Sequence, residues 1–218
     1  MLGLLKLKEF MNTEEYCAAH STAEDELLQE LVRYTHLHVM HPRMLSGHLQ
    51  GRLLSMVSQM LSPRRILEIG AFTGYATLCL AQGLAPDGIL HTIERNDELE
   101  DICRKFIQRS RHAQQIQLHI GDALEVIPTL DETFDLVFID GDKREYTDYF
   151  YAVIDKVRAG GFIIADNVLW DGKVLEKPTA NDAQTQGIIK FNETVQRDVR
   201  VENLLLSLRD GLMICRKV

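Results

Sequence analysis

A strand-like run that enters a glycine turn is the part of this sequence with the clearest chemical meaning. The run Arg65-Ile-Leu-Glu68-Ile leads into Gly70, and Gly74 follows before a helix-like segment. Glycines at such a junction let a ligand approach the backbone, and the next helix offers unpaired N–H groups. The spacing Glu-x-Gly-x-x-x-Gly differs from the Gly-x-Gly-x-x-Gly turn that binds a dinucleotide pyrophosphate. A carboxylate here repels a phosphate but suits S-adenosylmethionine, which carries an ammonium and a sulfonium.

Oxygen-bearing side chains follow two later strand-like runs. Asp140 ends the run that starts at Phe134, and Asp166-Asn167 ends the run that starts at Gly161. Two carboxylates and an amide oxygen are hard ligands, and the absence of nearby Cys or His favours magnesium over zinc. Three protein oxygens leave about three of six octahedral positions for a water and a bidentate substrate. The alternative is that acids after strands only cap the next helices, which we favour for Asp142 alone.

Three further residues have a position that favours a chemical role. Lys143 lies three residues after Asp140, and a nearby cation would disfavour its ammonium form, so it can serve as a neutral general base. Glu94 ends a strand-like run, where a carboxylate can accept both ribose hydroxyls. The alternatives are that Lys143 is an ordinary exposed lysine and that Glu94 is a solvated carboxylate at a strand end. Trp170 is the best candidate to cover an aromatic substrate.

Strand-like and helix-like segments alternate after residue 64 and predict the fold that positions these residues. The strand-like runs lie at 65–69, 89–94, 116–120, 134–140 and 161–166, with helices expected near 75–84, 97–110 and 144–158. This alternation predicts an α/β fold with a doubly wound, mostly parallel, seven-stranded sheet of the Rossmann-like type. Residues 201–208 and 212–216 predict a C-terminal antiparallel hairpin at the sheet edge.

The N-terminal region is expected to be helical. Residues 1–62 would form a helical cap on a core over 63–218, within a single domain. Ser21-Thr-Ala-Glu24 has the form of a capping box ahead of the first helix, and a second helix is expected from near Ser46. Residues 1–10 are interpreted as an upstream extension too short for a secretory signal, with Met11 as a second candidate start.

The composition argues against several classes of partner. The 218 residues carry a net charge of −8, which disfavours nucleic acid and anionic membranes and favours a small-molecule ligand. No run of about 18 apolar residues is present. The four cysteines lie far apart without a Cys-x-x-Cys pair, so we expect buried, reduced thiols and a cytoplasmic location; they are Cys17, Cys79, Cys103 and Cys215.

Several motifs, in order over nearly the whole chain, resemble those of the cation-dependent O-methyltransferases, the group that includes catechol and caffeoyl-CoA O-methyltransferases. They are Met44-Leu-Ser46 with Gln50-Gly51, Leu67–Tyr75, Thr92–Glu94, Gly121–Leu124, Phe134–Tyr146, Asp166–Trp170 and Asp210–Leu212. The resemblance implies a class I methyltransferase sheet that binds S-adenosylmethionine through Ser46, Glu68, Gly70, Phe72, Thr73, Ala76, Glu94, Asp122, Ala123 and Asp140.

The same resemblance implies the catalytic centre. Asp140, Asp166 and Asn167 would hold Mg²⁺, or Mn²⁺ or Ca²⁺, with Lys143 as base and with Asp140 and Asn167 also catalytic. Met44, Lys143 and Trp170 would line the substrate pocket. Two positions depart from the family: Ala76 replaces a serine that helps to hold the methionine carboxylate, at a cost of about 1 kcal/mol, and Gly141 replaces alanine or histidine.

The expected activity is methyl transfer from S-adenosylmethionine to one oxygen of a small vicinal-dihydroxy aromatic, by an enzyme expected to be a homodimer. One alternative acceptor is a coenzyme A thioester of caffeoyl type, which the balanced charges between Trp170 and Phe191 disfavour. A second alternative is a protein that binds S-adenosylmethionine without turnover. An NAD-dependent oxidoreductase lacks the pyrophosphate turn, and a nucleic-acid methyltransferase conflicts with the acidic charge.

Overall fold

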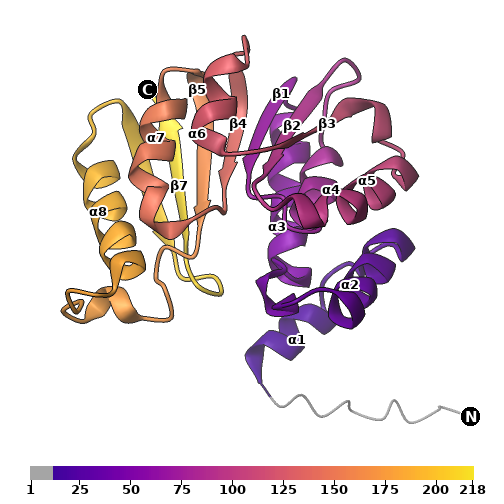
Figure 1. Cartoon of the computed structure of the whole chain (residues 1–218), viewed down its shortest axis with the longest axis horizontal. Helices are drawn as coiled ribbons and strands as arrows, with labels where there is room; N and C mark the ends of the chain where they lie inside the picture. Colours follow the sequence, from indigo (N-terminus) through magenta and orange to yellow (C-terminus); the bar gives the residue numbers. More distant parts are fainter. Residues whose placement is uncertain (1–11) are drawn as a thin grey trace, which may run out of the picture.

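The computed structural model describes residues 12–218, so the expected extension over residues 1–10 and the candidate start Met11 lie outside the described residues. Its centre is a seven-stranded sheet in the order β3-β2-β1-β4-β5-β7-β6 (Figure 1). The strands are β1 Arg65–Ile69, β2 Ile89–Glu94, β3 Ile116–Ile120, β4 Phe134–Ile139, β5 Val157–Asp166, β6 Val201–Leu206 and β7 Leu212–Lys217. The pairs of β7 with β5 and with β6 are antiparallel and the other described pairs are parallel, which confirms the predicted sheet and hairpin.

Helices cover both faces of the sheet (Figure 1). They are α1 Thr13–Ala19, α2 Glu26–His38, α3 His48–Leu61, α4 Tyr75–Ala81, α5 Glu100–Arg109, α6 Ala123–Val126, α7 Tyr146–Ile154 and α8 Ala183–Arg197. Successive strand residues point to opposite faces, so Ile66 packs with α2 to α5 while Leu67 packs with α6 to α8. The strand order reverses between β1 and β4, and open sheets bind ligands at such a switch point.

The N-terminal helices begin differently from the sequence prediction. The predicted capping box at Ser21 to Glu24 is wrong, because α2 begins at Glu26 and its N-cap is Asp25. The Asp25 carboxylate accepts a hydrogen bond from the backbone N–H of Leu28 at 2.9 Å. Asp25 has the same capping chemistry and lies nearer the apolar positions of the helix. Cys17 on α1 is exposed, so only the other three cysteines are buried as expected.

Helix α8 was not predicted, although its buried residues Ile188, Phe191 and Val195 recur at helical spacing. Polar residues and Gly187 weaken that pattern. The glycine has a packing reason, since a Cβ there would lie 2.3 Å from the carbonyl oxygen of Lys143. Residues 157 and 158, expected at the end of a helix, instead begin β5. Between residues 12 and 218, no helix combines the length and apolar character needed to cross a membrane.

Candidate active site

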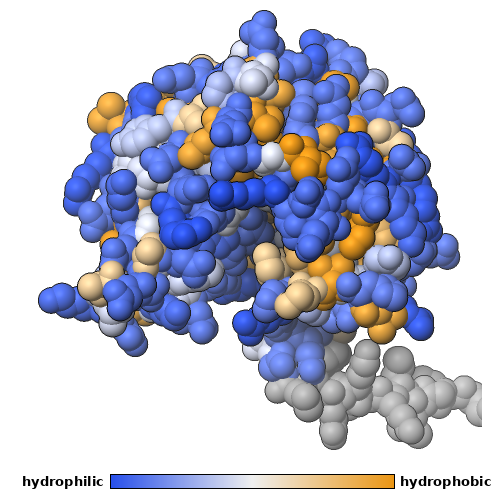
Figure 2. All heavy atoms as spheres, viewed as in Figure 1, coloured by the Kyte–Doolittle hydropathy of each residue, from blue (hydrophilic) through white to orange (hydrophobic). Residues whose placement is uncertain are grey.

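A cleft of about 1120 Å³ opens at the carboxyl ends of the central strands. Further lining comes from residues 38–44 at and after the end of α2, from residues 95–102 after β2, from residues 167–173 after β5, and from Gln184, Arg209 and Asp210. Figure 2 shows the molecule hollowed on this face, between the part that carries α8 and the part that carries α2. The predicted site residues that line the cleft are Met44, Gly70, Phe72, Glu94, Ala123, Asp140, Lys143, Asp166, Asn167 and Trp170. Those that do not line it are Ser46, Glu68, Thr73, Ala76 and Asp122.

The glycine turn after β1 is shaped by its contacts with two neighbouring strands. Gly70 has φ +96°, and a Cβ at this position would lie 2.2 Å from the carbonyl oxygen of Asp140, so only glycine fits. The N–H groups of Gly70 and Ala71 both donate to the carbonyl oxygen of Ile93, at 2.9 and 3.1 Å. Gly74, with φ +91°, then begins α4. The turn therefore presents bare backbone to the cleft at the switch point.

Glu68 lies beneath this turn, because its side chain points to the sheet face covered by α4. It is fully buried, and its Oε2 accepts hydrogen bonds from Thr77 and, at 2.6 Å, from Thr92. Burial raises the pKa of this carboxyl to about 7, although the two hydroxyl donors oppose the shift. The Glu68 carboxyl therefore lies behind the cleft wall and does not line the cleft.

Glu94 at the end of β2 does line the cleft and is 8% exposed. Its Oε2 accepts from the backbone N–H of Phe72 at 2.7 Å, and its Oε1 accepts from that of Asn96 at 2.8 Å. Burial raises its pKa, against these backbone hydrogen bonds. Since each carboxylate oxygen can accept more than one hydrogen bond, Glu94 can fix the turn and still accept from a ligand hydroxyl.

Lys143 connects the ends of β4 and β5 through a buried set of hydrogen bonds. Its Nζ donates to Asp140 Oδ1 and to the hydroxyl oxygen of Tyr146, each at 2.8 Å. The Tyr146 hydroxyl in turn donates to the backbone oxygen of Asp166 at 3.0 Å. Burial raises the pKa of Tyr146 well above its usual value, so the phenol stays protonated. Sequence reasoning gave Tyr146 no role, although it lies one helical turn after Lys143.

Asp166 at the end of β5 is 2% exposed and has both carboxylate oxygens engaged. Oδ2 accepts from Gln50 Nε2 at 2.6 Å, and Oδ1 accepts from the backbone N–H of Asn167 at 2.7 Å. Burial, and then repulsion from Asp140, raise the pKa of Asp166 to about 6. Asn167 has φ +57°, a conformation that asparagine adopts more readily than most residues.

The oxygen-bearing side chains at the ends of β4 and β5 suit a hard divalent cation. Residues 12–218 contain no group of three or more His, Cys, Asp or Glu side chains placed to hold a metal ion. The predicted set has two carboxylates and one amide, namely Asp140, Asp166 and Asn167, and all three line the cleft. A bound cation would offset the repulsion that raises the Asp166 pKa. Oxygen donors of this type fit Mg²⁺ better than zinc.

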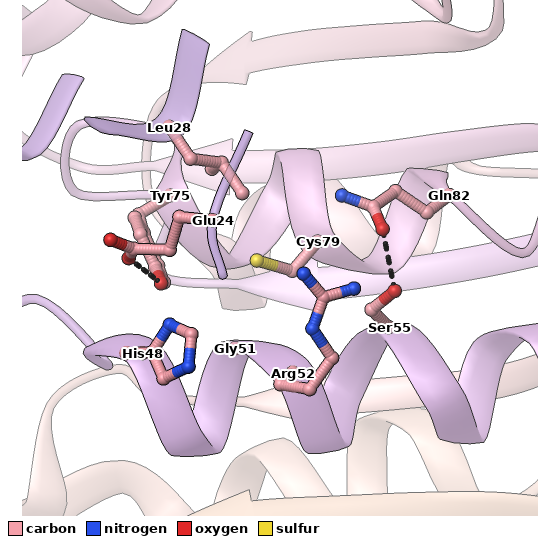
Figure 3. A pocket seen from close by; sticks show the side chains of 9 residues that line it. All are labelled: Glu24, Leu28, His48, Gly51, Arg52, Ser55, Tyr75, Cys79 and Gln82. Atoms are coloured by element: carbon pink, nitrogen blue, oxygen red, sulfur yellow. Dashed lines mark hydrogen bonds between the residues drawn. The ribbon is translucent and has the colours of Figure 1, made fainter. Parts of the chain in front are cut away.

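A second pocket, between α3 and α4, is far smaller, at about 10 Å³ (Figure 3). There the Tyr75 hydroxyl donates to Glu24 at 2.5 Å, and the Ser55 hydroxyl donates to Gln82 at 2.6 Å. Gly51 permits this packing, since a Cβ would lie 2.6 Å from the Tyr75 ring. The space holds about one water molecule, so this region packs the N-terminal helices onto the core and cannot admit a cofactor.

The fold and the cleft define a class I methyltransferase. The structure matches that of the O-methyltransferase from Bacillus cereus in complex with SAH, with a TM-score of 0.87, 30% identity, and coverage of 94% of this chain and 96% of that one. It also matches TomG from Streptomyces achromogenes in complex with SAM, with a TM-score of 0.86, 29% identity, and coverage of 93% and 94%.

Sequence comparisons identify the family. An O-methyltransferase family model matches residues 18–218. A catechol O-methyltransferase of Niastella koreensis is 35% identical over 163 residues, 73% of each chain. Caffeoyl-CoA O-methyltransferase 5 of Nicotiana tabacum is 31% identical over 206 residues, 89% of this chain and 85% of the relative. The chain therefore belongs to the cation-dependent O-methyltransferase family and is an S-adenosylmethionine-dependent O-methyltransferase.

Proposed function

We propose that this protein methylates one hydroxyl of a small vicinal-dihydroxy aromatic and requires a divalent cation, with Mg²⁺ the first choice. The observation that carries the proposal is that Asp140, Lys143, Asp166 and Asn167 line one cleft with the glycine turn. Asp140, Asp166 and Asn167 would hold this cation, whose positive charge would lower the pKa of a substrate hydroxyl in the cleft. We call these four residues the metal half of the cleft.

The other side of the cleft, which we call the cofactor half, contains Gly70, Phe72, Glu94 and Ala123. We assign it to S-adenosylmethionine, the methyl donor. Glu94 would accept hydrogen bonds from the ribose hydroxyls, and the bare backbone at Gly70 would admit the ligand close to the sheet. Ser46, Glu68, Thr73, Ala76 and Asp122, which do not line the cleft, would support this half from behind.

Lys143 is the group we assign to accept the proton of the attacked hydroxyl. It is 8% exposed, it lines the cleft beside Asp140, and Tyr146 holds its Nζ from the other side. The backbone at Lys143 packs directly on Gly187 of α8, which restrains its position. Trp170, whose ring centre lies 5.9 Å from Lys143 Nζ, would cover the aromatic ring together with Met44. Much of the catalysis would come from alignment of oxygen, methyl and sulfur.

The metal assignment is tested by removal and replacement of the cation. EDTA should abolish turnover of a catechol, and added Mg²⁺ should restore it. Asp166→Ala should lose turnover while it keeps S-adenosylmethionine affinity by calorimetry, because the side chain lies in the metal half. Full turnover in the presence of chelator would contradict the assignment. A variant that loses cofactor affinity as well would show that the two halves are not separate.

The acceptor is tested by a comparison of caffeate with caffeoyl-CoA. A thioester carries phosphates that need cationic partners. In the segment that follows Trp170, the charges of Lys173, Lys177 and Lys190 are offset by those of Asp171, Glu176 and Asp182. We therefore expect the free catechol to have the higher kcat/KM at saturating S-adenosylmethionine and Mg²⁺. A clear preference for the thioester would reverse this choice.

The proposal extends to the assembly and location of the enzyme. We propose a homodimer that acts in the cytoplasm on a small molecule, without nucleic acid or membrane as a partner. The net charge of −8 supports the absence of an anionic polymer or surface among its ligands. Light scattering coupled to size-exclusion chromatography measures the mass directly, and a monomer at micromolar concentration would contradict the dimer.

A further inference from the structure

The turn of the β6–β7 hairpin contacts the N-terminal wall of the cleft through Arg209. This guanidinium donates to the backbone oxygens of Ser46 and, at 3.3 Å, of Leu45, and to Gln50 Oε1 at 3.3 Å. Arg209 itself has φ +49°, an uncommon conformation for a residue with a side chain. The long Arg209 side chain is thus held by three acceptors in residues 45–50, a segment far from it in sequence.

Gln50 links Arg209 to Asp166 in the metal half through one hydrogen bond to each. It is fully buried, and its Nε2 donates to Asp166 Oδ2 at 2.6 Å while its Oε1 accepts from Arg209. An amide has one donating and one accepting end. Because the guanidinium can only donate, it favours the orientation in which the accepting end faces Arg209 and the donating end faces Asp166.

The same turn also holds the segment after β5. The backbone oxygens of Asp210 and Gly211 accept from Leu169 at 2.8 Å and from Val168 at 3.2 Å, and the Asp210 carboxylate accepts from the N–H of Asp171. Gly211 has φ +87°, and a Cβ there would lie 2.5 Å from Leu169 Cγ. The hairpin turn therefore fixes the backbone between Asn167 and Asp171 while Arg209 fixes the opposite wall.

From these contacts we propose that Arg209 is a positioning residue for divalent-cation binding. It orients the Gln50 amide, the amide orients the Asp166 carboxylate, and the affinity of the metal half for its cation depends on this chain of contacts. The cofactor half depends on it less, because none of these hydrogen bonds involves Gly70, Phe72, Glu94 or Ala123, and Arg209 reaches that half only through the backbone oxygen of Ser46, behind the cleft wall. This inference rests on the proposed function, since it concerns the same cation site.

The experiment measures Mn²⁺ binding to the whole protein in the absence of substrate. Free Mn²⁺ is followed by electron paramagnetic resonance, and quenching of Trp170, the single tryptophan, gives a second readout from within the cleft. The variants are Arg209→Ala, Arg209→Lys, Gln50→Leu and the double variant that combines Arg209→Ala with Gln50→Leu. The matched control is Arg216→Ala, which removes an exposed arginine of the same hairpin that pairs with Glu202 at 3.2 Å.

We expect Gln50→Leu to weaken Mn²⁺ binding by about tenfold and Arg209→Ala by about three- to tenfold. Arg209→Lys should recover part of the loss, since an ammonium can still donate to Gln50. The double variant should bind no more weakly than Gln50→Leu alone, because Arg209 acts through Gln50. Affinity for S-adenosylmethionine should stay within about twofold in Gln50→Leu, and in the Arg209 variants it should fall by less than the Mn²⁺ affinity does. Arg216→Ala should match the wild type.

Three outcomes would overturn the inference while the proposed function stands. They are unchanged Mn²⁺ affinity in Arg209→Ala, additive losses in the double variant, and an equal loss of S-adenosylmethionine affinity, which would indicate general loosening of the fold. A wild-type protein that binds no Mn²⁺ would overturn the metal part of the proposed function and this inference together. If Arg209→Ala fails to fold, Arg209→Lys and Gln50→Leu carry the same test.

Discussion

The two halves of the cleft are built in different ways. In the cofactor half, the central contact joins the backbone N–H of Phe72 to Glu94, which are 22 residues apart. In the metal half, Gln50 and Asp166 are 116 residues apart, and Arg209 and Gln50 are 159 apart. The first half depends mainly on backbone geometry within one β-α-β unit, which contains all of its residues except Ala123. The second depends on side chains delivered by the N-terminal helices and by the C-terminal hairpin, so distant substitutions should affect it most.

The largest expected effect is in the metal half, at Lys143. Lys143→Met removes the proposed base and its hydrogen bonds to Asp140 and Tyr146. The rate of methyl transfer should fall by about 10² to 10⁴ in single-turnover experiments, while S-adenosylmethionine affinity stays close to that of the wild type. Lys190→Met, which alters an exposed lysine of α8, is the matched control. A loss below about tenfold would remove Lys143 from the role of base.

A pH-dependent effect on stability is expected behind the cofactor half. Burial raises the Glu68 pKa from 4.5 to about 7 in the folded state. A group with a raised pKa gives its full stabilisation below the unfolded pKa and loses it as the pH rises through the folded one, because the buried carboxyl must then ionise. The wild type should therefore lose this stability between pH 4.5 and pH 8, whereas Glu68→Gln has no carboxyl to ionise. The unfolding free energy of Glu68→Gln relative to the wild type should rise over this range by about 3 kcal/mol at most.

Urea denaturation of the wild type and Glu68→Gln at pH 5 and pH 8 measures this difference. Thr129→Val changes an exposed hydroxyl at the end of the short 3-10 helix Ile127–Thr129 before β4, and serves as a control whose difference from the wild type should not depend on pH. A constant difference between wild type and Glu68→Gln would show that the carboxyl does not titrate in this range. Unchanged S-adenosylmethionine affinity in Glu68→Gln would support its position behind the cleft wall.

A smaller effect is expected at Glu94, on the cleft side of the same half. Glu94→Ala removes the acceptor for the backbone N–H groups of Phe72 and Asn96 and the proposed acceptor for the ribose. S-adenosylmethionine should bind more weakly by roughly 1.5–3 kcal/mol in calorimetry, with Mn²⁺ affinity retained. An unchanged dissociation constant for the cofactor would leave Glu94 a purely structural residue of the turn.

The smallest expected effect is at Ala76, in the first turn of α4. Ala76→Ser adds the hydroxyl that the family usually carries here, and S-adenosylmethionine should bind more tightly by about 1 kcal/mol. Calorimetry of the two proteins under the same conditions gives the difference. The side chain of Ala76 is buried and does not line the cleft, so weaker binding in the variant would mean that this position does not correspond to the family serine.

Much of the cofactor half was predictable because its signals are local. Gly70 and Gly74 lie where the chain must adopt positive φ, and the alternation of apolar runs with helix-length segments predicted a mostly parallel sheet. The switch point between β1 and β4 came from the structure. The positions of Asp140 and Asp166 at strand ends followed from the same alternation. Local rules were less decisive between competing caps, as the N-cap of α2 at Asp25 shows.

By itself, the sequence determined which polar residues end the strands and which residues must be glycine at the turn, because period-two burial and backbone sterics act over a few residues. Only the tertiary structure decided that Glu68 lies behind the cleft, that Gln50 reaches Asp166, and that Arg209 reaches Gln50. These contacts join segments that no local pattern relates. The contacts of Gln50 and Arg209 form because α3, the end of β5 and the turn between β6 and β7 meet at the carboxyl ends of the central strands.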